Sequence, residues 1–449
     1  MNLKTKQIKL STFQLIVLLY FIGALLSTSL LMLPVSQKPG VDLSFIDALF
    51  IAVSALSVTG LTSVATVDTF STVGYFFIMF ILQVGGIGIM TLSSIIWLLV
   101  GKKIGMRERH LIMADQNRTD LSGLVKLMRD IFLLILGIEA VGALILGTYF
   151  MQDYETASEA FLHGLFGSIS ATTNGGFDIT GQSLVLYADD YFVQFINMIL
   201  IILGAIGFPV LIEIKNYLTH RGTYPYRFTL FTKLTTTMYA ILAVIGTAGI
   251  YLLDRKHFFA DKTWHESFFY SAFQSIAARS GGLTTMDLNE FSASTLLLIS
   301  TLMFIGASPS SVGGGLRTTT FAIAMLSVYF FARGKNTIKI FNREVHPIDI
   351  HRSFVVVTTG FFIWGASIML LSFLEPSLPL LSIIFEVSSA FGTTGSSLGI
   401  TPELGTPAKL VIICLMFIGR IGLFSLLFII RGRVIKDGFS YPKERLLIG

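Results

Sequence analysis

Eight stretches of this sequence are apolar over a length that can cross a lipid bilayer. The hydrocarbon core of a bilayer is about 30 Å thick, and a helix needs about 20 apolar residues to span it. Only 13% of the residues are charged, about half the share of a typical soluble domain. The sequence therefore predicts an all-α polytopic membrane protein. Its expected spans are residues 12–33, 74–100, 131–150, 191–214, 229–253, 293–305 continuing at 319–331, 354–374 and 408–430.

The first span follows a short polar start and has no small-residue cleavage site behind it. We therefore expect a retained helix and not a signal peptide. The single cysteine, Cys414, lies inside the last span, which excludes an internal disulfide and a thiolate metal cluster.

Lysine and arginine are distributed unevenly between the loops. Most of the 32 lie in the two chain ends and in the loops after the second, fourth and sixth spans. Because cytoplasmic loops carry an excess of these residues, we expect a multi-pass plasma-membrane protein with both termini cytoplasmic. The opposite loops contain only five basic residues, which are Lys38, Arg255, Lys256, Lys262 and Lys409.

The same outer loops are rich in acidic residues, among them Asp42, Asp47, Asp68, Asp178, Asp189 and Glu266. A negative mouth raises the local concentration of cations. The alternative is that outer loops only lack lysine and arginine, and the sequence leaves both interpretations open.

A polar, glycine-containing motif occurs four times. It reads SALSVTGLT at 54–62, SATTNGGFD at 170–178, AARSGGLTT at 277–285 and SAFGTTGSS at 389–397. The copies align on Gly60, Gly176, Gly282 and Gly395, at separations of 116, 106 and 113 residues. Alanine stands five positions before each of these glycines; serine at minus six and phenylalanine at minus ten occur in three copies, and the third copy has them one place off. An internal repeat of this kind indicates four copies of one structural unit.

A second glycine signature follows each aligned glycine after 24 to 28 residues. It reads GGIG from Gly85, GAIGFP from Gly204, GASPS from Gly306 and GRIG from Gly419. One small-residue cluster in a membrane helix is weak support, because close helix packing favours glycine anyway. Four pairs in phase with four pairs of spans indicate a unit of span, short helix, polar glycine loop and span.

The apolar stretch before each polar loop is about 12 residues long, which suits a re-entrant helix and not a span. Non-helical backbone at membrane depth is tolerated only where it is buried in protein or lines a wet cavity. Four such loops can surround one axis, and carbonyl oxygens that converge on an axis replace the hydration shell of a cation. Each preceding helix would direct its negative C-terminal dipole at that cation. The expected units are residues 12–100, 101–218, 219–331 and 332–430, followed by a cytoplasmic tail at 431–449.

These motifs resemble the Ktr/Trk/HKT superfamily of potassium transporters, most closely the Ktr membrane subunit. The resemblance covers essentially the whole chain and includes the segment GASPSSVGGGLRTTTF at 306–321. It implies four helix, pore helix, filter loop and helix repeats around one pore, with eight transmembrane helices and four re-entrant pore helices. It also implies potassium uptake, a homodimer, and regulation by a cytosolic nucleotide-binding ring of the KtrA or KtrC type, with the nucleotide on that subunit.

The resemblance implies a selectivity filter with potassium held at the four aligned glycines. Glycine at all four positions goes with potassium preference in the family, whereas serine in the first loop goes with sodium preference. A sodium requirement, sodium selectivity and sodium/potassium symport remain open alternatives. The expected filter residues are Val58, Thr59, Gly60, Asn174, Gly175, Gly176, Ser280, Gly281, Gly282, Thr393, Thr394 and Gly395.

The third motif contains Arg279, whose charge would oppose conduction if it faced the ions. We expect this side chain to point back into the protein and to pair with an acid such as Glu266 or Asp287.

The sixth span is interrupted at residues 306–320, because Pro309 and three consecutive glycines are unfavourable in a regular helix. One interpretation is a kink tolerated for packing. The other is a flexible loop below the filter that obstructs the pore until a signal moves it, as the gating loop of the family does. The expected gating residues are Gly306, Ser308, Pro309, Ser310, Gly313, Gly314, Gly315 and Arg317.

Arg420, in the GRIG signature of the last span, should not face lipid, because an unpaired charge there costs at least about 2.5–3.5 kcal/mol. It matches a family arginine below the filter, as an electrostatic barrier or an anchor of the gating loop. Arg317 ends the gating loop, and the alternative for it is that its side chain only extends to the cytoplasmic surface. Glu386 and Glu139 are the acids available at membrane depth, and the sequence does not pair them.

Basic cytoplasmic loops such as residues 102–120 serve topology and attraction to lipid headgroups, or dock the regulatory ring. No nucleic-acid partner is expected. The Walker P-loop and HExxH motifs do not occur, so we expect no enzyme. An alternating-access carrier of another solute also uses broken helices, but it usually has two inverted repeats and not four parallel ones. A structural subunit without transport would need the four loops to be accidental.

Overall fold

The computed structural model describes residues 12–88, 123–220 and 225–431, with a few isolated positions between and after them. Most of the predicted basic loop at 102–120 and of the tail at 431–449 lies outside the described residues. The described chain is built from helices, apart from one short hairpin of β1 (Lys339–Ile340) and β2 (Arg343–Glu344). The prediction of an all-α membrane protein is therefore confirmed.

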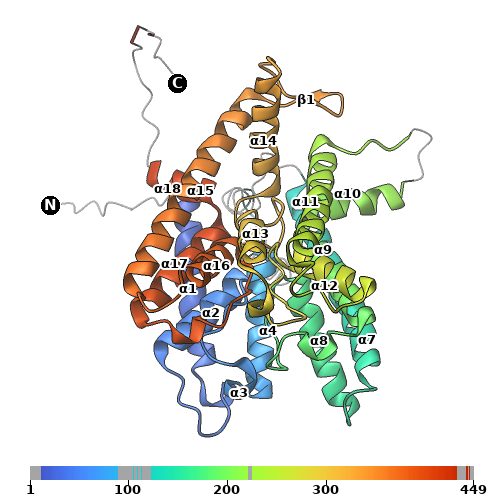
Figure 1. Cartoon of the computed structure of the whole chain (residues 1–449), viewed down its shortest axis with the longest axis vertical. Coiled ribbons are helices and arrows are strands. Elements are labelled where there is room, and N and C mark those ends of the chain that lie inside the picture. The colour runs from blue at the N-terminus through green and yellow to red at the C-terminus, as the bar shows by residue number, and fades with distance from the viewer. Residues whose placement is uncertain are drawn as a thin grey trace, which may run out of the picture.

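Four described helices are long and apolar enough to cross a membrane singly. Each comes first in a unit of three elements, and Figure 1 shows the units distributed around a common centre. A re-entrant helix follows each of them in the sequence. The long helices are α1 (Thr12–Leu31), α7 (Leu124–Phe150), α11 (Leu230–Asp254) and α15 (Pro347–Leu374).

The four re-entrant helices have 13 to 16 residues, which at 1.5 Å per residue is too short to cross the bilayer. Three of them begin with a hydroxyl side chain that accepts a hydrogen bond from the backbone N–H three residues later: Ser44, Thr156 and Thr263. Such capping satisfies N–H groups that have no partner within the helix. The re-entrant helices are α2 (Phe45–Ser57), α8 (Ala157–Thr172), α12 (Trp264–Ala277) and α16 (Leu380–Gly392).

The second helix of each unit ends or bends at the second glycine signature. α9 (Tyr191–Ala205) meets α10 (Phe208–Leu218) at an angle of 104°. α17 (Thr406–Ile421) is separated from α18 (Leu423–Arg431) by Gly422. α4 (Thr72–Ile87) ends before Gly88, and a loop separates α13 (Ala293–Phe304) from α14 (Thr318–Ala332). The prediction of a single interrupted span is therefore wrong.

The backbone at these breaks explains the error. Gly88, Gly207 and Gly422 have φ values of 95°, 102° and 87°, which only glycine adopts readily. These are the last glycines of GGIG, GAIG and GRIG. The sequence signal for these breaks was the alignment of this glycine in three copies. Hydropathy alone did not reveal the breaks.

The units close into a ring through one repeated contact. The second helix of each unit packs against the re-entrant helix of the next: α4 on α8, α9 on α12, α13 on α16, and α17 back on α2. The last contact brings the two ends of the described chain side by side, as the red and blue helices in Figure 1 show. Remaining short elements are η1 (Pro34–Ser36), α3 (Thr66–Thr69), η2 (Val185–Tyr187), η3 (Leu288–Glu290) and η4 (Thr401–Glu403).

Candidate functional site

The four aligned glycines meet at the centre of the ring. A Cβ built on Gly60 would lie 3.0 Å from Gly176 Cα, and one on Gly176 would lie 3.0 Å from Gly282 Cα. A Cβ on Gly282 would lie 3.4 Å from Gly395 Cα, and one on Gly395 would lie 2.9 Å from Gly60 Cα. Residues more than 100 positions apart in sequence thus form one closed circle of backbone.

Backbone oxygens fill the space where side chains would otherwise project. The Thr59 carbonyl oxygen lies 2.2 Å from the Cβ position of Gly395, and the Thr394 oxygen lies 2.3 Å from that of Gly282. The Gly175 oxygen is 2.5 Å from that of Gly60. Any larger residue at these positions would collide with a neighbouring loop. The circle is therefore lined by main-chain oxygens and not by side chains of the four aligned residues. A ring of carbonyl dipoles is a ligand set for a dehydrated monovalent cation.

All four loops share one backbone pattern. The aligned glycine and the residue two positions before it have positive φ, whereas the residue between them does not. Positive φ is uncommon outside glycine, so its occurrence at four equivalent non-glycine positions indicates a conformation imposed by the surrounding structure. These positions are Val58 (57°), Asn174 (55°), Ser280 (69°) and Thr393 (48°).

The re-entrant helices hold the loops through the serine of the motif. Ser54 Oγ accepts a hydrogen bond from Gly60 N–H at 3.1 Å, and Ser389 Oγ accepts one from Gly395 N–H at 3.0 Å. In the third unit, Ser275 stands one place off and donates instead to the Ala243 carbonyl on α11 at 2.9 Å. The one-place shift of the serine in the third motif therefore corresponds to a different hydrogen-bond partner.

In three of the four units, the first glycine of the second signature packs directly against the re-entrant helix of the same unit. A Cβ on Gly85 would lie 2.2 Å from the carbonyl oxygen of Leu56, at the end of α2. Gly204 and Gly419 make the same contact with the Thr172 and Phe391 oxygens, at 2.1 and 2.2 Å. All three oxygens belong to the residue four positions before the aligned glycine, so the two signatures touch within a unit.

The loop between α13 and α14 lies against this assembly and forms hydrogen bonds with the second and fourth units. Gly314 N–H donates to Thr393 Oγ1 at 2.7 Å, and a Cβ on Gly313 would lie 2.6 Å from Ser280 Cβ. Its backbone hydrogen bonds to the other units lie at the breaks of the second helices. The N–H groups of Ser308, Val312 and Gly315 donate to the carbonyls of Ala205 (3.1 Å), Gly204 (3.3 Å) and Gly419 (3.2 Å), respectively. In the opposite direction, Phe208 N–H donates to the Ser310 carbonyl at 2.7 Å.

Arg420 connects this loop to the first unit. Its guanidinium is buried and donates to the Val312 carbonyl of the loop and to the carbonyls of Gly85 and Gly86 at the end of α4. Carbonyl oxygens at a helix C-terminus carry the negative end of its dipole and suit a cation. The geometry is that of an anchor between loop and helix.

A family model described as TrkH, cation transport protein, matches residues 5–435. This chain belongs to the TrkH family. It is 55% identical over 442 residues to Ktr system potassium uptake protein D of Bacillus subtilis, covering 98% of both chains. It is 33% identical to potassium/sodium uptake protein NtpJ of Enterococcus hirae, again over 98% of both chains. The predicted resemblance to the superfamily is confirmed.

The fold is also that of a solved TrkH structure. The crystal structure of the potassium transporter TrkH from Vibrio parahaemolyticus matches with a TM-score of 0.72 at 21% identity, covering 95% of this chain and 86% of that one. At this identity the comparison concerns the fold alone.

Arg279 is placed differently from the prediction within this TrkH-family fold. It points back into the protein as expected and is fully buried, but neither Glu266 nor Asp287 is its partner. Its Nη1 donates to the Tyr239 carbonyl at 2.9 Å, and the guanidinium lies 3.5 Å from the centroid of the Tyr239 ring. A cation–π contact with α11 thus takes the place of the expected ion pair.

The two expected acids serve as caps instead. Glu266 Oε2 accepts from Thr263 N–H at 2.7 Å, closing a capping box at the start of α12, and these hydrogen bonds lower the pKa of the Glu266 carboxyl. Asp287 Oδ1 accepts from Asn289 N–H at 2.9 Å. Short local bonds of this kind form without bringing distant segments together.

Arg317 bonds to its own loop. Its Nη1 donates to the carbonyls of Ser308, at 3.3 Å, and Gly313, so the partly buried side chain folds back over the loop that it ends. The acids at membrane depth bind neutral donors: Glu139 accepts from Gln83 Nε2, and Glu386 accepts from Ser397 and Thr401.

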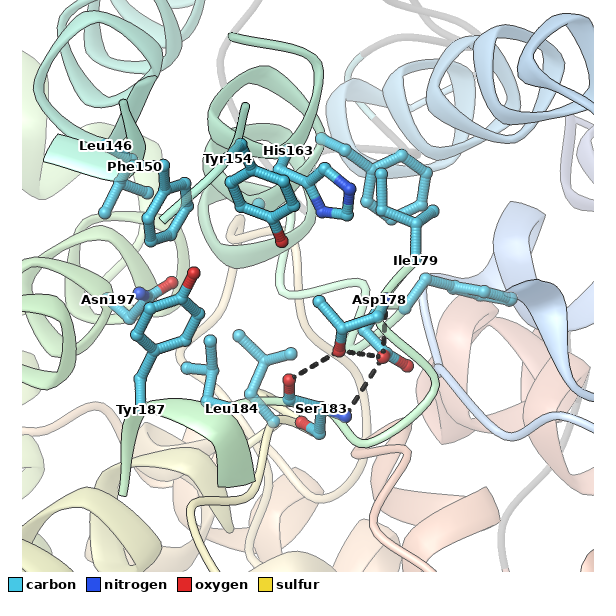
Figure 2. A pocket seen from close by; sticks show the side chains of 15 residues that line it. Leu146, Phe150, Tyr154, His163, Asp178, Ile179, Ser183, Leu184, Tyr187 and Asn197 are labelled. Carbon is cyan, nitrogen blue, oxygen red and sulfur yellow. Dashed lines mark hydrogen bonds between the residues drawn. The ribbon is translucent and has the colours of Figure 1, made fainter. Parts of the chain in front are cut away.

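A small cavity of about 40 Å³ lies beside the second loop. In Figure 2 the stacked rings of Tyr154 and His163 line one side, and those of Phe150 and Tyr187 line another. The dashed lines converge on Asp178, which accepts from Ser183 N–H at 3.0 Å. The volume accommodates only water-sized molecules, so this cavity is not a site for a larger solute.

A larger crevice of about 440 Å³ opens between α11 and α14. Its lining is mostly apolar and it lies away from the glycine circle, so it does not have the convergent polar groups of a solute site. The residues that line it are Leu234, Thr237, Met238, Ile241, Ala322, Met325, Leu326, Tyr329, Ile340 and Phe341.

Proposed function

We propose that this chain takes up potassium across the plasma membrane through a single pore, whose selectivity filter is the circle of the four loops. The observation that carries the proposal is the mutual contact of Gly60, Gly176, Gly282 and Gly395. Four loops with the same sequence motif and the same φ pattern support it, and in this proposal their main-chain oxygens surround one axis. Potassium is the substrate in this proposal, and relatives named for potassium uptake support that choice.

The loop between α13 and α14 is the gate in this proposal. Its contact with Ser280 and Thr393 puts it directly against the filter loops. Hydrogen bonds to helix ends hold it, together with the buried side chains of Val312 and Leu316. Each hydrogen bond contributes only about 1 kcal/mol, so the loss of a few of them is enough to release the loop. Arg420 acts as its anchor and places positive charge at the inner end of the path.

The remaining parts of the proposal rest on the family resemblance. They are a homodimer, a cytosolic nucleotide-binding ring that controls the gate, cytoplasmic termini, and the four units bounded as predicted. Sodium coupling is the main alternative within the family, because one relative is named for both potassium and sodium.

The test is uptake by cells that lack their own potassium transporters, carrying the chain with Gly→Ser or Gly→Asp changes at the four positions. Each change places atoms within about 3 Å of a neighbouring loop, so we expect growth on limiting potassium to fail. Gly40→Ser is the matched control, because Gly40 also has positive φ (86°) but nothing within 4 Å of its Cβ position. Normal growth of all filter variants would refute the filter, and uptake of sodium in preference to potassium would favour the alternative.

A further inference from the structure

Glu386 is a buried acid with no role in the function described above. It lies in the middle of α16, and its side chain is completely buried. Among the ion pairs of the described residues, none includes Glu386. A buried carboxyl group without hydrogen bonds would be strongly destabilising, so the partners that it does have are informative.

Both partners of Glu386 belong to the segment that leaves the fourth loop. Ser397 Oγ donates to Oε2 at 2.8 Å, and Thr401 Oγ1 donates to Oε1. Ser397 stands two residues after Gly395, and Thr401 stands six residues after it. Glu386 therefore binds the outer part of the fourth loop to its own re-entrant helix at two points.

The hydrogen of the Ser397 hydroxyl can be assigned. Its oxygen accepts from Gly399 N–H at 3.0 Å, so its own hydrogen is available to the carboxyl group. The Ser397 hydroxyl thus links the Glu386 carboxyl group to the backbone N–H of Gly399 through two hydrogen bonds.

The other loops have no counterpart of this contact at the same position. Nine positions before the aligned glycine, where the fourth unit has Glu386, the other units have Ile51, Gly167 and Phe273. The second unit instead uses Asp178, two positions after its glycine, which accepts from the N–H groups of Thr180, Gly181 and Ser183 at 2.7–3.1 Å. Loops two and four, which lie opposite each other in the order of the circle, are thus each held by one carboxyl group.

We propose that Glu386 is a positioning residue for the fourth filter loop and that it sets how tightly and how selectively the circle of oxygens binds a monovalent cation. This inference rests on the proposed filter. The physical reason is that Gly395 is held from two sides: Ser389 bonds its N–H from within the helix, and Glu386 restrains the chain that follows. Loss of the second restraint lets the loop relax, and a relaxed ring of oxygens no longer distinguishes ions that differ in size.

The experiment compares Glu386→Gln, Ser397→Ala and Thr401→Val in the full chain. Initial rates of potassium uptake are measured against potassium concentration, with and without competing sodium. Glu403→Gln is the matched control, because Glu403 is an exposed acid two residues from Thr401, so it removes charge from the same mouth without touching the contact. Amounts of folded protein are taken from gel filtration in detergent.

We expect Glu386→Gln to raise the KM for potassium by about tenfold, which corresponds to about 1.4 kcal/mol, and to make sodium a stronger competitor. Ser397→Ala and Thr401→Val should change KM in the same direction by smaller factors, with the maximal rate per folded protein less affected than KM. Glu403→Gln should remain close to wild type.

Unchanged KM and unchanged sodium competition in Ser397→Ala and Thr401→Val would overturn the inference, even if Glu386→Gln did not fold. An equal effect of Glu403→Gln would also overturn it, because charge at the mouth would then be the cause. With either of these two results, loss of uptake in Gly395→Asp would still support the proposed filter. Normal growth of the Gly395 variants on limiting potassium would overturn both the proposed filter and the role of Glu386.

Discussion

At the scale of single residues, glycine has two separate roles in this chain. In the circle, Gly60, Gly176, Gly282 and Gly395 adopt positive φ and leave room for the oxygens of the next loop. In the second signature, the glycines allow a helix to cross the carbonyl end of its own re-entrant helix at contact distance. The first role belongs to the proposed filter, and the second concerns stability.

The second role predicts a stability loss for Gly85→Ala. The new methyl group would lie 2.2 Å from the Leu56 carbonyl oxygen, and both are backbone-linked, so the helices must separate at a cost of about 1–3 kcal/mol. Thermal unfolding in detergent should show a lower Tm than for wild type. Gly137→Ala in α7 is the control, because its Cβ position has nothing within 4 Å and alanine favours helix. Equal Tm values for the two variants would contradict this contact.

At the scale of elements, the breaks in the second helices create the place that the α13–α14 loop occupies. Carbonyls of Gly204, Ala205 and Gly419 are released from regular helix and accept N–H groups of the loop. A helix that ends in the interior must find partners for its last carbonyls. The loop and Arg420 supply them, so the broken helices and the loop stabilise one another.

Deletion of residues 310–316 should therefore raise potassium flux and weaken control by the proposed regulatory ring. The deletion removes the bonds to Thr393, Gly204 and Gly419, so the path below the circle is no longer covered. The same deletion combined with Gly395→Asp is the control, and it should carry no flux, because ions would still have to cross the circle. Flux that stays low and fully regulated in the single deletion would argue against a gate.

At the scale of the whole molecule, the ring is closed by contact between the last unit and the first. Lys409 Nζ lies 2.7 Å from Asp47 Oδ1, joining the start of α17 to the first turn of α2 across 362 residues of sequence. Both side chains are largely buried, at 10% and 17% exposed. The outer-side positions of both residues were predicted, but their pairing was not.

Burial raises the pKa of the Asp47 carboxyl, which lies outside the spanning helices, but hydrogen bonds from Lys409 and Ser44 outweigh it, and the pKa lies below its ordinary value. A carboxyl group with a depressed pKa in the folded state stabilises the protein above its unfolded pKa, near 4. That contribution is lost as the pH falls through the folded pKa.

Lys409→Met should lower the free energy of unfolding by about 2 kcal/mol at neutral pH, because a buried carboxylate loses its charged donor. The difference from wild type should shrink in acid, below about pH 4, where Asp47 is protonated. Thermal unfolding in detergent at both pH values measures this. Lys256→Met, an exposed lysine on the same side, should change neither. A Lys409→Met protein as stable as wild type would show that ring closure does not depend on this pair.

Much of the architecture could be predicted because it is written in local patterns. Apolar length identified the long first helices, and the repeated serine, alanine and glycine spacing located the re-entrant helices and their loops. The errors arose where several segments meet. Arg279 was assigned an acid by charge, but Tyr239 of a neighbouring helix lies closer. For Arg317, extension to the surface was the alternative to a place in the loop, and the carbonyls that it binds belong to that loop.

The amino-acid sequence by itself determined that this chain lies in a membrane, that it repeats one unit four times, and that glycine recurs where backbone must approach backbone. Only the tertiary structure decided which oxygen faces which glycine, that the second helices break in all four units as far as they are described, and that Lys409 closes the ring on Asp47. The reason is physical. Hydrophobic length and backbone dihedrals are properties of adjacent residues, whereas contacts between units depend on how the helices pack, and no local pattern specifies the partner.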